Sequence, residues 1–160
     1  MPGARCTFVL NGSRLSALVC DGRIYSAFSG DRGHENKPSD TALPSLGPLP
    51  KGTYYIVDRQ SGGRLGWLWD TAAAFLNNAH KDSWFALYRN DGVIDDWTYV
   101  NGVKRGGFRL HPVGRSAISE GCITLTSPAQ FERLRAYLKS QTPKIIPGST
   151  IRYYGTVEVK

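Results

Sequence analysis

The chain has 160 residues, which suits one domain with one hydrophobic core, and its 41% hydrophobic and 21% charged residues exclude a chain disordered throughout. The formal net charge of +7 favours polyanionic partners such as nucleic acid, anionic lipid or the carboxylate-rich bacterial wall. The basic residues are scattered and form no run typical of a nucleic-acid-binding arm, so no nucleic-acid partner is expected.

Neither a membrane span nor a signal peptide is expected. No apolar run approaches the roughly 18 residues that a membrane-spanning helix needs. Apolar patches occur between Met1 and Cys20, but Asn11-Gly12-Ser13-Arg14 interrupts them before a continuous apolar stretch builds up. We therefore expect a protein made in the cytoplasm without a signal peptide.

The first third of the chain predicts a β-meander. Three runs with strand character, Cys6–Leu10, Arg14–Cys20 and Arg23–Phe28, are separated by Asn11-Gly12 and Asp21-Gly22. Such pairs tolerate positive φ angles at both turn positions, which is why they close hairpins.

Two of the three cysteines, Cys6 and Cys20, fall on the two strands of the first predicted hairpin. They either pair across the hairpin or are separate core residues. Burial as free core cysteines is the favoured interpretation, because free cysteine is among the most buried residue types.

The middle of the chain alternates loops with regular elements. The polar segment 29–50, rich in Gly and Pro, predicts a long loop, and long loops in compact domains are often functional. Thr53–Asp58 and Ser83–Arg89 predict strands, and the alanine-rich Asp70–Asn78 predicts a short helix.

The last third contains the clearest helix of the sequence, between strands predicted at Phe108–His111 and Ile151–Val159. Ser127 is the expected N-cap, Pro128 lies in the first turn, and Gln130 completes a capping box. The apolar residues of this helix share one face: Phe131, Leu134 and Leu138. The elements together predict a mainly β fold with one or two short helices.

The segment that follows the strand at Phe108–His111 carries the candidate chemistry. A cysteine attacks a carbonyl as its thiolate, and a free thiol titrates near ~8.5, so Cys122 needs a neighbouring base or cation. His111 lies upstream and supplies the base if the chain turns back, which Gly114 permits. The alternative is a buried core cysteine and a surface histidine; the surrounding motif favours the catalytic interpretation.

Neighbouring residues complete the predicted site. Gly121 lets a substrate carbonyl approach the backbone, and the amides of Gly121 and Cys122 are candidates for an oxyanion hole. Ser119 is a candidate hydrogen-bond partner of His111 or of the substrate. Arg115 is a candidate ligand for a substrate carboxylate because its guanidinium is a planar fork.

Two aromatic residues are the best candidates to line a substrate cleft. Trp97 and Tyr99 lie in a polar, Gly-flanked stretch, 90–107. Asp95-Asp96 before them imitates an acid pair, but adjacent carboxylates on an extended chain point to opposite faces, so a solvated turn is favoured.

No metal and no cofactor are expected. His34 and His80, with Glu35 and Asp82, are the residues that suggest a metal ion. Their spacing matches no standard site.

Two groups of residues resemble the catalytic domain of L,D-transpeptidases. His111-x-x-Gly114 followed by Ser119-x-Gly121-Cys122 is similar to the family signature, and most similar to the branch secreted as type VI secretion antibacterial effectors. Gly47–Ile56 resembles the Gly-Pro-x-Pro-x-Gly-x-Tyr segment that leads into a barrel strand. The similarity runs from about residue 29 to residue 125.

The chain departs from mainstream L,D-transpeptidases at two places. Glu120 stands where they typically carry histidine, and Ile123-Thr124 stands where they often continue to Asn or Arg. The roles of those family positions are therefore not carried over to this chain.

The resemblance implies one L,D-transpeptidase-like catalytic domain over residues 1–160, a small β-barrel or sandwich. Cys122 would attack the third residue of a peptidoglycan tetrapeptide stem and expel the terminal D-alanine, with His111 as the base. Water as acceptor gives L,D-carboxypeptidase activity, a free D-amino acid gives exchange, and a second stem gives a cross-link.

The resemblance also implies partners and a location. Delivery by a contractile secretion machine into the periplasm of a rival cell would reconcile a wall substrate with the missing signal peptide. The expected partners are then the stems, D-amino acids, components of the secretion machine and a periplasmic immunity protein.

Two other functions compete with this interpretation. A papain-like cysteine peptidase of the cell wall usually places cysteine before histidine, the reverse of the order here. A non-catalytic basic wall-binding module would use the net charge and would not need Cys122.

Overall fold

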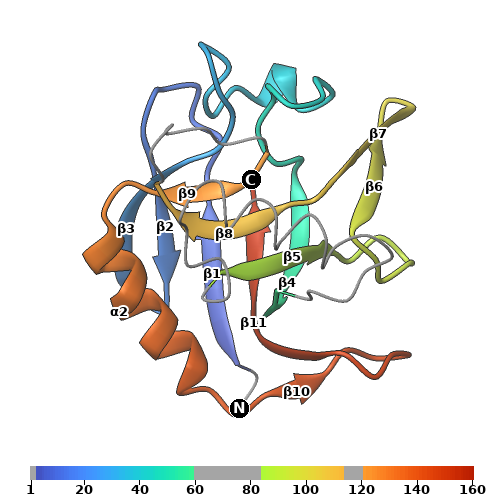
Figure 1. Ribbon diagram of the computed structural model, residues 1–160. Coiled ribbons are helices and arrows are strands. Elements are labelled where there is room, and N and C mark those ends of the chain that lie inside the picture. The colour runs from blue at the N-terminus through green and yellow to red at the C-terminus, as the bar shows by residue number, and fades with distance from the viewer. Residues whose placement is uncertain (1–2, 60–83, 114–120) are drawn as a thin grey trace, which may run out of the picture.

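The computed structural model describes residues 3–59, 84–113 and 121–160. Within these ranges, eight strands form a closed barrel: β1 (Ala4–Phe8), β2 (Ser16–Cys20), β3 (Arg23–Phe28), β9 (Ile123–Leu125), β8 (Arg109–Pro112), β5 (Phe85–Arg89), β4 (Gly52–Asp58) and β11 (Arg152–Val159). This is their order around the wall, and parallel pairing of β1 with β11 completes the circle (Figure 1). The predicted mainly β fold is confirmed.

The barrel is filled from within and partly covered from outside. Side chains alternate across a strand, so Tyr54 and Ile56 of β4 join the main core while Tyr55 and Val57 belong to a second apolar cluster. Ile146, which follows the short strand β10 (Lys144–Ile145), is buried in that second cluster. This covering explains why β4 and β5 carry apolar residues on both faces.

The helix α2 (Pro128–Lys139) forms as the sequence predicts. Ser127 has an extended backbone, and its hydroxyl accepts a 3.2 Å hydrogen bond from the Gln130 amide. The helix packs against β8, β9 and β11. Its predicted apolar face is buried in the barrel core: Phe131, Leu134 and Leu138. The second predicted helix, Asp70–Asn78, lies outside the described residues.

The predicted meander is confirmed as β1, β2 and β3, with one correction. The Asp21-Gly22 turn has positive φ angles of 49° and 84°, as expected for a tight hairpin. The first connection is longer than predicted, because β2 begins at Ser16 rather than Arg14. There the side chain of Asn11 accepts from the Ser13 amide and donates to the Leu15 carbonyl, which closes the loop locally.

A hairpin that the sequence analysis did not predict projects from the barrel (Figure 1). It consists of β6 (Trp97–Val100) and β7 (Val103–Gly106), joined by Asn101-Gly102 with φ angles of 49° and 80°. The Asn-Gly pair was the available signal, but the glycines and charges around it made the whole stretch resemble a loop.

The long loop over residues 29–50 is confirmed, with one 3-10 turn, η1 (Pro38–Asp40). Its two ends are joined by buried polar groups. The Ser29 amide donates to the Asn36 side chain, and the Ser29 hydroxyl accepts from the Leu49 amide at 2.8 Å. These bonds satisfy buried backbone groups and give the loop a defined shape.

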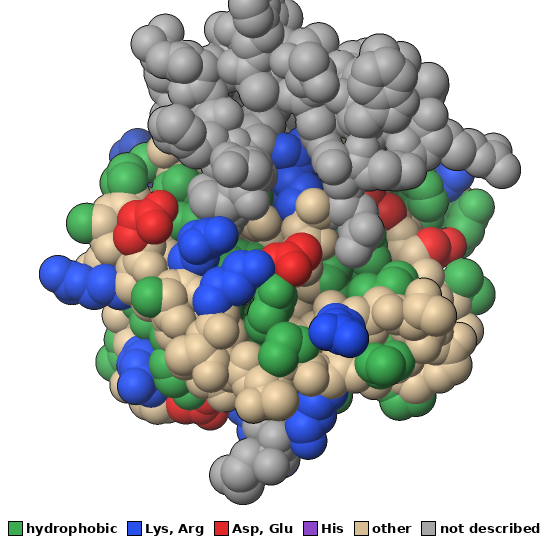
Figure 2. Space-filling model, turned by 60° about the horizontal axis from the view of Figure 1, so that its bottom comes forward, with side chains coloured by type: hydrophobic (Ala, Val, Ile, Leu, Met, Phe, Trp, Pro, Cys, Tyr) green, Lys and Arg blue, Asp and Glu red, His purple; other side chains and the backbone are tan. Residues whose placement is uncertain are grey.

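Positive charge is spread over the surface. On the face in Figure 2, Lys and Arg side chains are separated by hydrophobic, uncharged and acidic ones. Among the helices described, none is long and apolar enough to span a membrane.

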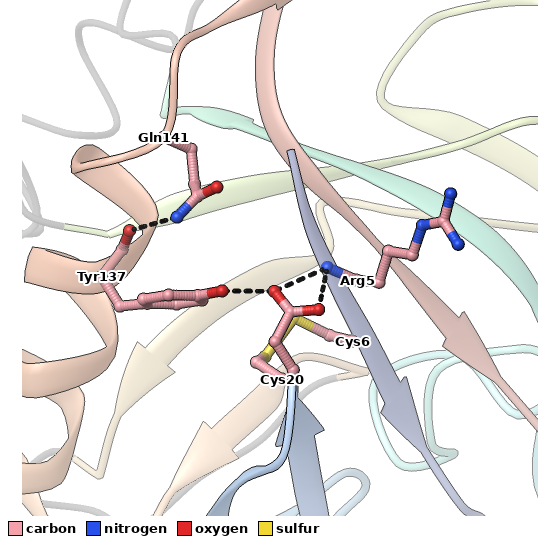
Figure 3. The surroundings of a disulfide bond; sticks show 6 residues. Arg5, Cys6, Cys20, Tyr137 and Gln141 are labelled. Atoms are coloured by element: carbon pink, nitrogen blue, oxygen red, sulfur yellow. Dashed lines mark hydrogen bonds between the residues drawn. A yellow bond between two sulfur atoms is a disulfide. The ribbon is translucent and has the colours of Figure 1, made fainter. Parts of the chain in front are cut away.

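Cys6 and Cys20 form a disulfide between the paired positions of β1 and β2 (Figure 3). The favoured prediction of free cysteines is therefore wrong, although both residues are buried as it required. Beside the bond, the Asp21 carboxylate accepts from the Arg5 amide and from the Tyr137 hydroxyl, so α2 is tied to this hairpin. The direct cross-strand register explains the pairing.

Reduction of this disulfide is expected to lower the free energy of unfolding by about 3 kcal/mol, because the bond closes a loop with a sequence separation of 14 residues. Urea unfolding with and without dithiothreitol measures the difference. The double variant Cys6→Ala/Cys20→Ala is the control, since dithiothreitol should not change its stability. Equal unfolding curves for oxidised and reduced wild type would contradict the expectation.

Candidate active site

The candidate site lies where β8 and β9 run side by side in parallel. Leu110 pairs with Ile123 and His111 pairs with Thr124. Leu110 and Ile123 are buried in the core, so His111 and Thr124 face the opposite side of the wall. The parallel pairing brings β9 beside β8, as the catalytic interpretation requires, and Cys122 immediately precedes β9.

The imidazole of His111 is buried and held from three directions. Nδ1 lies 2.7 Å from the Pro112 carbonyl oxygen, which accepts only, so Nδ1 carries the proton of this hydrogen bond. Nε2 lies 3.4 Å from the Thr124 hydroxyl. The ring stacks on Trp84 at 4.3 Å between centroids. In the neutral ring, this tautomer leaves the lone pair on Nε2, the atom that takes a proton from a nucleophile.

Cys122 is 8% exposed, with its sulfur 4.0 Å from the Gly107 carbonyl oxygen. The residue before it, Gly121, has a φ of 81°, a conformation that residues with a Cβ rarely adopt. A Cβ at position 121 would lie 2.4 Å from Nη2 of Arg105 and 3.0 Å from the Phe108 ring. Glycine is therefore required by conformation and by space.

Two arginines that sequence analysis missed lie near the thiol. Arg109, at the start of β8, forms a bidentate ion pair with Asp96, with both N–O distances 2.8 Å. Burial opposes its charge, but Asp96, together with the charge of Cys122, outweighs it and raises the pKa of Arg109 above its usual value. Asp96 is thus ion-paired rather than part of a solvated turn, while Asp95 accepts from the Trp97 amide.

Arg105 on β7 is the second missed residue, and it has no carboxylate partner among the described residues. Burial lowers the pKa of Arg105 below its usual value, whereas the charges of Tyr54 and Cys122 act in the opposite direction. No local sequence motif marks either arginine. Arg105 reaches the site on the β6–β7 hairpin, which the sequence did not predict.

The structure leaves part of the predicted site apart or undescribed. Gly114, Arg115 and Ser119 lie outside the described residues. Trp97 and Tyr99 lie on β6, 50% and 64% exposed, and border a pocket of about 290 Å³. The described lining of this pocket includes neither His111 nor Cys122, so these aromatic residues are not brought together with the thiol.

No group of three His, Cys, Asp or Glu side chains in the described ranges is placed to hold a metal ion. Of the residues considered for a metal, His34 instead binds Asp40 through Nδ1 at 2.8 Å. His80 and Asp82 lie outside the described residues.

A protein-family model described as the Tlde1 domain matches residues 23–149. The match contains His111 and Cys122, and it leaves out β1, β2 and β11, which close the barrel. Neither the curated proteins nor the solved structures gave a match to the chain.

Gly121→Ala is expected to cost about 1–3 kcal/mol of stability more than Gly102→Ala, because overpacking adds to the cost of positive φ. The two glycines have φ angles of 81° and 80°, but a Cβ at position 102 meets nothing within 4 Å. Urea unfolding of both variants separates collision from conformation. Equal losses of stability would show that Arg105 and Phe108 do not restrict position 121.

Proposed function

The chain belongs to the Tlde1 domain family of type VI secretion L,D-transpeptidase effector domains, and on this premise we propose that it is an L,D-carboxypeptidase and D-amino-acid exchange enzyme acting on tetrapeptide stems. The family makes it a peptidoglycan-modifying effector with L,D-transpeptidase-like activity. The observation that supports the finer proposal is the parallel pairing of β8 with β9, which sets His111 opposite Thr124, two positions after Cys122.

In the proposed reaction Cys122 is the nucleophile and His111 is the base. Nε2 of His111 takes the thiol proton, and the sulfur attacks the carbonyl of the third stem residue. The Sγ–C bond forms, the C–N bond to D-alanine breaks, and the leaving amine receives the proton from Nε2. The Pro112 carbonyl supports this cycle, because it holds Nδ1–H and stabilises the imidazolium that forms in between.

The thioester then reacts with an acceptor. Attack by water releases a tripeptide stem and restores the thiol, whereas attack by a free D-amino acid restores a tetrapeptide with a new last residue. The backbone amides of Gly121 and Cys122 are the proposed oxyanion donors. Ser119 and Arg115 are proposed to contact the substrate, and Trp97 and Tyr99 are proposed to bind it farther from the thiol.

The proposed place of action is the periplasm of a target cell, with an immunity protein protecting the producer. The family supports delivery into target cells. The disulfide between Cys6 and Cys20 supports an oxidising compartment as the place of action, because such bonds persist there and are rare in the cytosol.

Wild-type protein incubated with purified tetrapeptide muropeptides should release the terminal D-alanine, and Cys122→Ala should leave the substrate unchanged, because the acyl-enzyme cannot form. Mass spectrometry detects the loss, and added D-methionine should appear in an exchange product. Both proteins should be folded, and the Cys122 thiol of wild type should be reduced. If neither protein then changed the muropeptides, the function would instead be that of a non-catalytic basic wall-binding module.

Expression with a periplasmic export signal should slow growth more than cytoplasmic expression, because the wall is accessible only from the periplasm. Growth curves at matched protein levels measure the effect, and exported Cys122→Ala is the control. Equal harm from both compartments would contradict a periplasmic target.

A further inference from the structure

Arg105 is a buried charge whose described hydrogen-bond partners are carbonyl oxygens. The residue is only 3% exposed to solvent. Nη1 donates to the carbonyls of Thr41 and Pro48, and Nη2 donates to that of Gly47 at 3.1 Å. A buried ion is costly unless it is compensated, and carbonyl dipoles compensate less than a carboxylate does. The site therefore holds a positive charge that no described carboxylate neutralises.

The same guanidinium lies against the turn that carries Cys122. Nη2 occupies the space that a Cβ of Gly121 would need, and the guanidinium carbon lies 5.5 Å from the Phe108 ring centroid. An ionised Cys122 also interacts with Arg105 through its charge. One side chain thus connects the β6–β7 hairpin, the loop over residues 41–48 and the predicted nucleophile.

We propose that Arg105 is a positioning residue, which fixes the Gly121–Cys122 turn against the 41–48 loop and stabilises the Cys122 thiolate by its buried charge. This inference rests on the proposed role of Cys122 as nucleophile. His111 supplies the base, and Arg105 supplies the field in which the thiolate forms. A positive charge in a site of low dielectric acts more strongly than the same charge in water.

Two variants of Arg105 separate the positioning of the turn from the stabilisation of the thiolate. Arg105→Lys keeps a positive charge but loses the planar fork that reaches several carbonyls at once. Arg105→Met keeps an unbranched apolar side chain of similar length, but it loses both the positive charge and the planar fork. We therefore expect the thiolate effect to survive in Arg105→Lys and to vanish in Arg105→Met, while both variants lose stability.

The test is the rate of iodoacetamide alkylation of Cys122 as a function of pH, because the thiolate is the reacting species and the measurement needs no turnover. The disulfide removes Cys6 and Cys20 from the reaction. Arg105→Met should move the midpoint of the alkylation profile upward by about one pH unit or more, as expected for loss of a nearby opposite charge. Arg105→Lys, which keeps the positive charge, should have a midpoint close to that of wild type.

Arg89→Met is the matched control. Arg89 on β5 donates to the Lys51 carbonyl and the Thr98 hydroxyl, so it also holds the loop before β4, but its contacts do not include the turn at Gly121. It should lose stability and keep the wild-type midpoint.

An unchanged midpoint in folded Arg105→Met would overturn the proposal. If that variant did not fold, an upward shift of about one unit or more in Arg105→Lys would overturn it, because the charge would then have no effect. Muropeptide turnover by Cys122→Ala would instead refute the proposed function, which keeps the two failures distinct.

Discussion

The parallel pairing of β8 with β9 is the constraint on which the candidate site depends. Leu110 and Ile123 are buried in the barrel core, which fixes the register of the two strands. Because side chains alternate across a strand, the same register places His111 beside Thr124 on the other face. A slip of one residue would bring apolar side chains out and turn His111 inward. The chemistry on one face is thus held in place by hydrophobic packing on the other.

The charges around the thiol are arranged unequally. Asp96 neutralises Arg109 through a bidentate pair, whereas the hydrogen bonds of Arg105 to described residues go to carbonyl oxygens. The Pro112 carbonyl keeps the proton of neutral His111 on Nδ1, away from the acceptor nitrogen. Among the described residues, no carboxylate neutralises Arg105, and a positive charge close to a thiol favours its anionic form.

Local signals predicted what depends on local physics. The cap at Ser127, the Asp21-Gly22 turn and the strand at Arg23–Phe28 each follow from neighbouring residues, and the structure confirms them. The parallel partner of β8 was missed because β9 has only three residues, and Arg105 was missed because its partners are about 60 positions away in sequence. Partners that distant leave no local pattern, so only the folded chain reveals them.

The three cysteines have different chemical states for structural reasons. Cys6 and Cys20 face each other in the core on β1 and β2, outside the range matched by the family model, and β1 also closes the barrel against β11. Cys122 immediately precedes β9, on the other side of the sheet order from β1, and it is a free cysteine. Thiol–disulfide exchange requires access to a disulfide sulfur, and burial of both sulfur-bearing residues prevents it. The Cys6–Cys20 disulfide and a free thiol at Cys122 are therefore compatible in one chain.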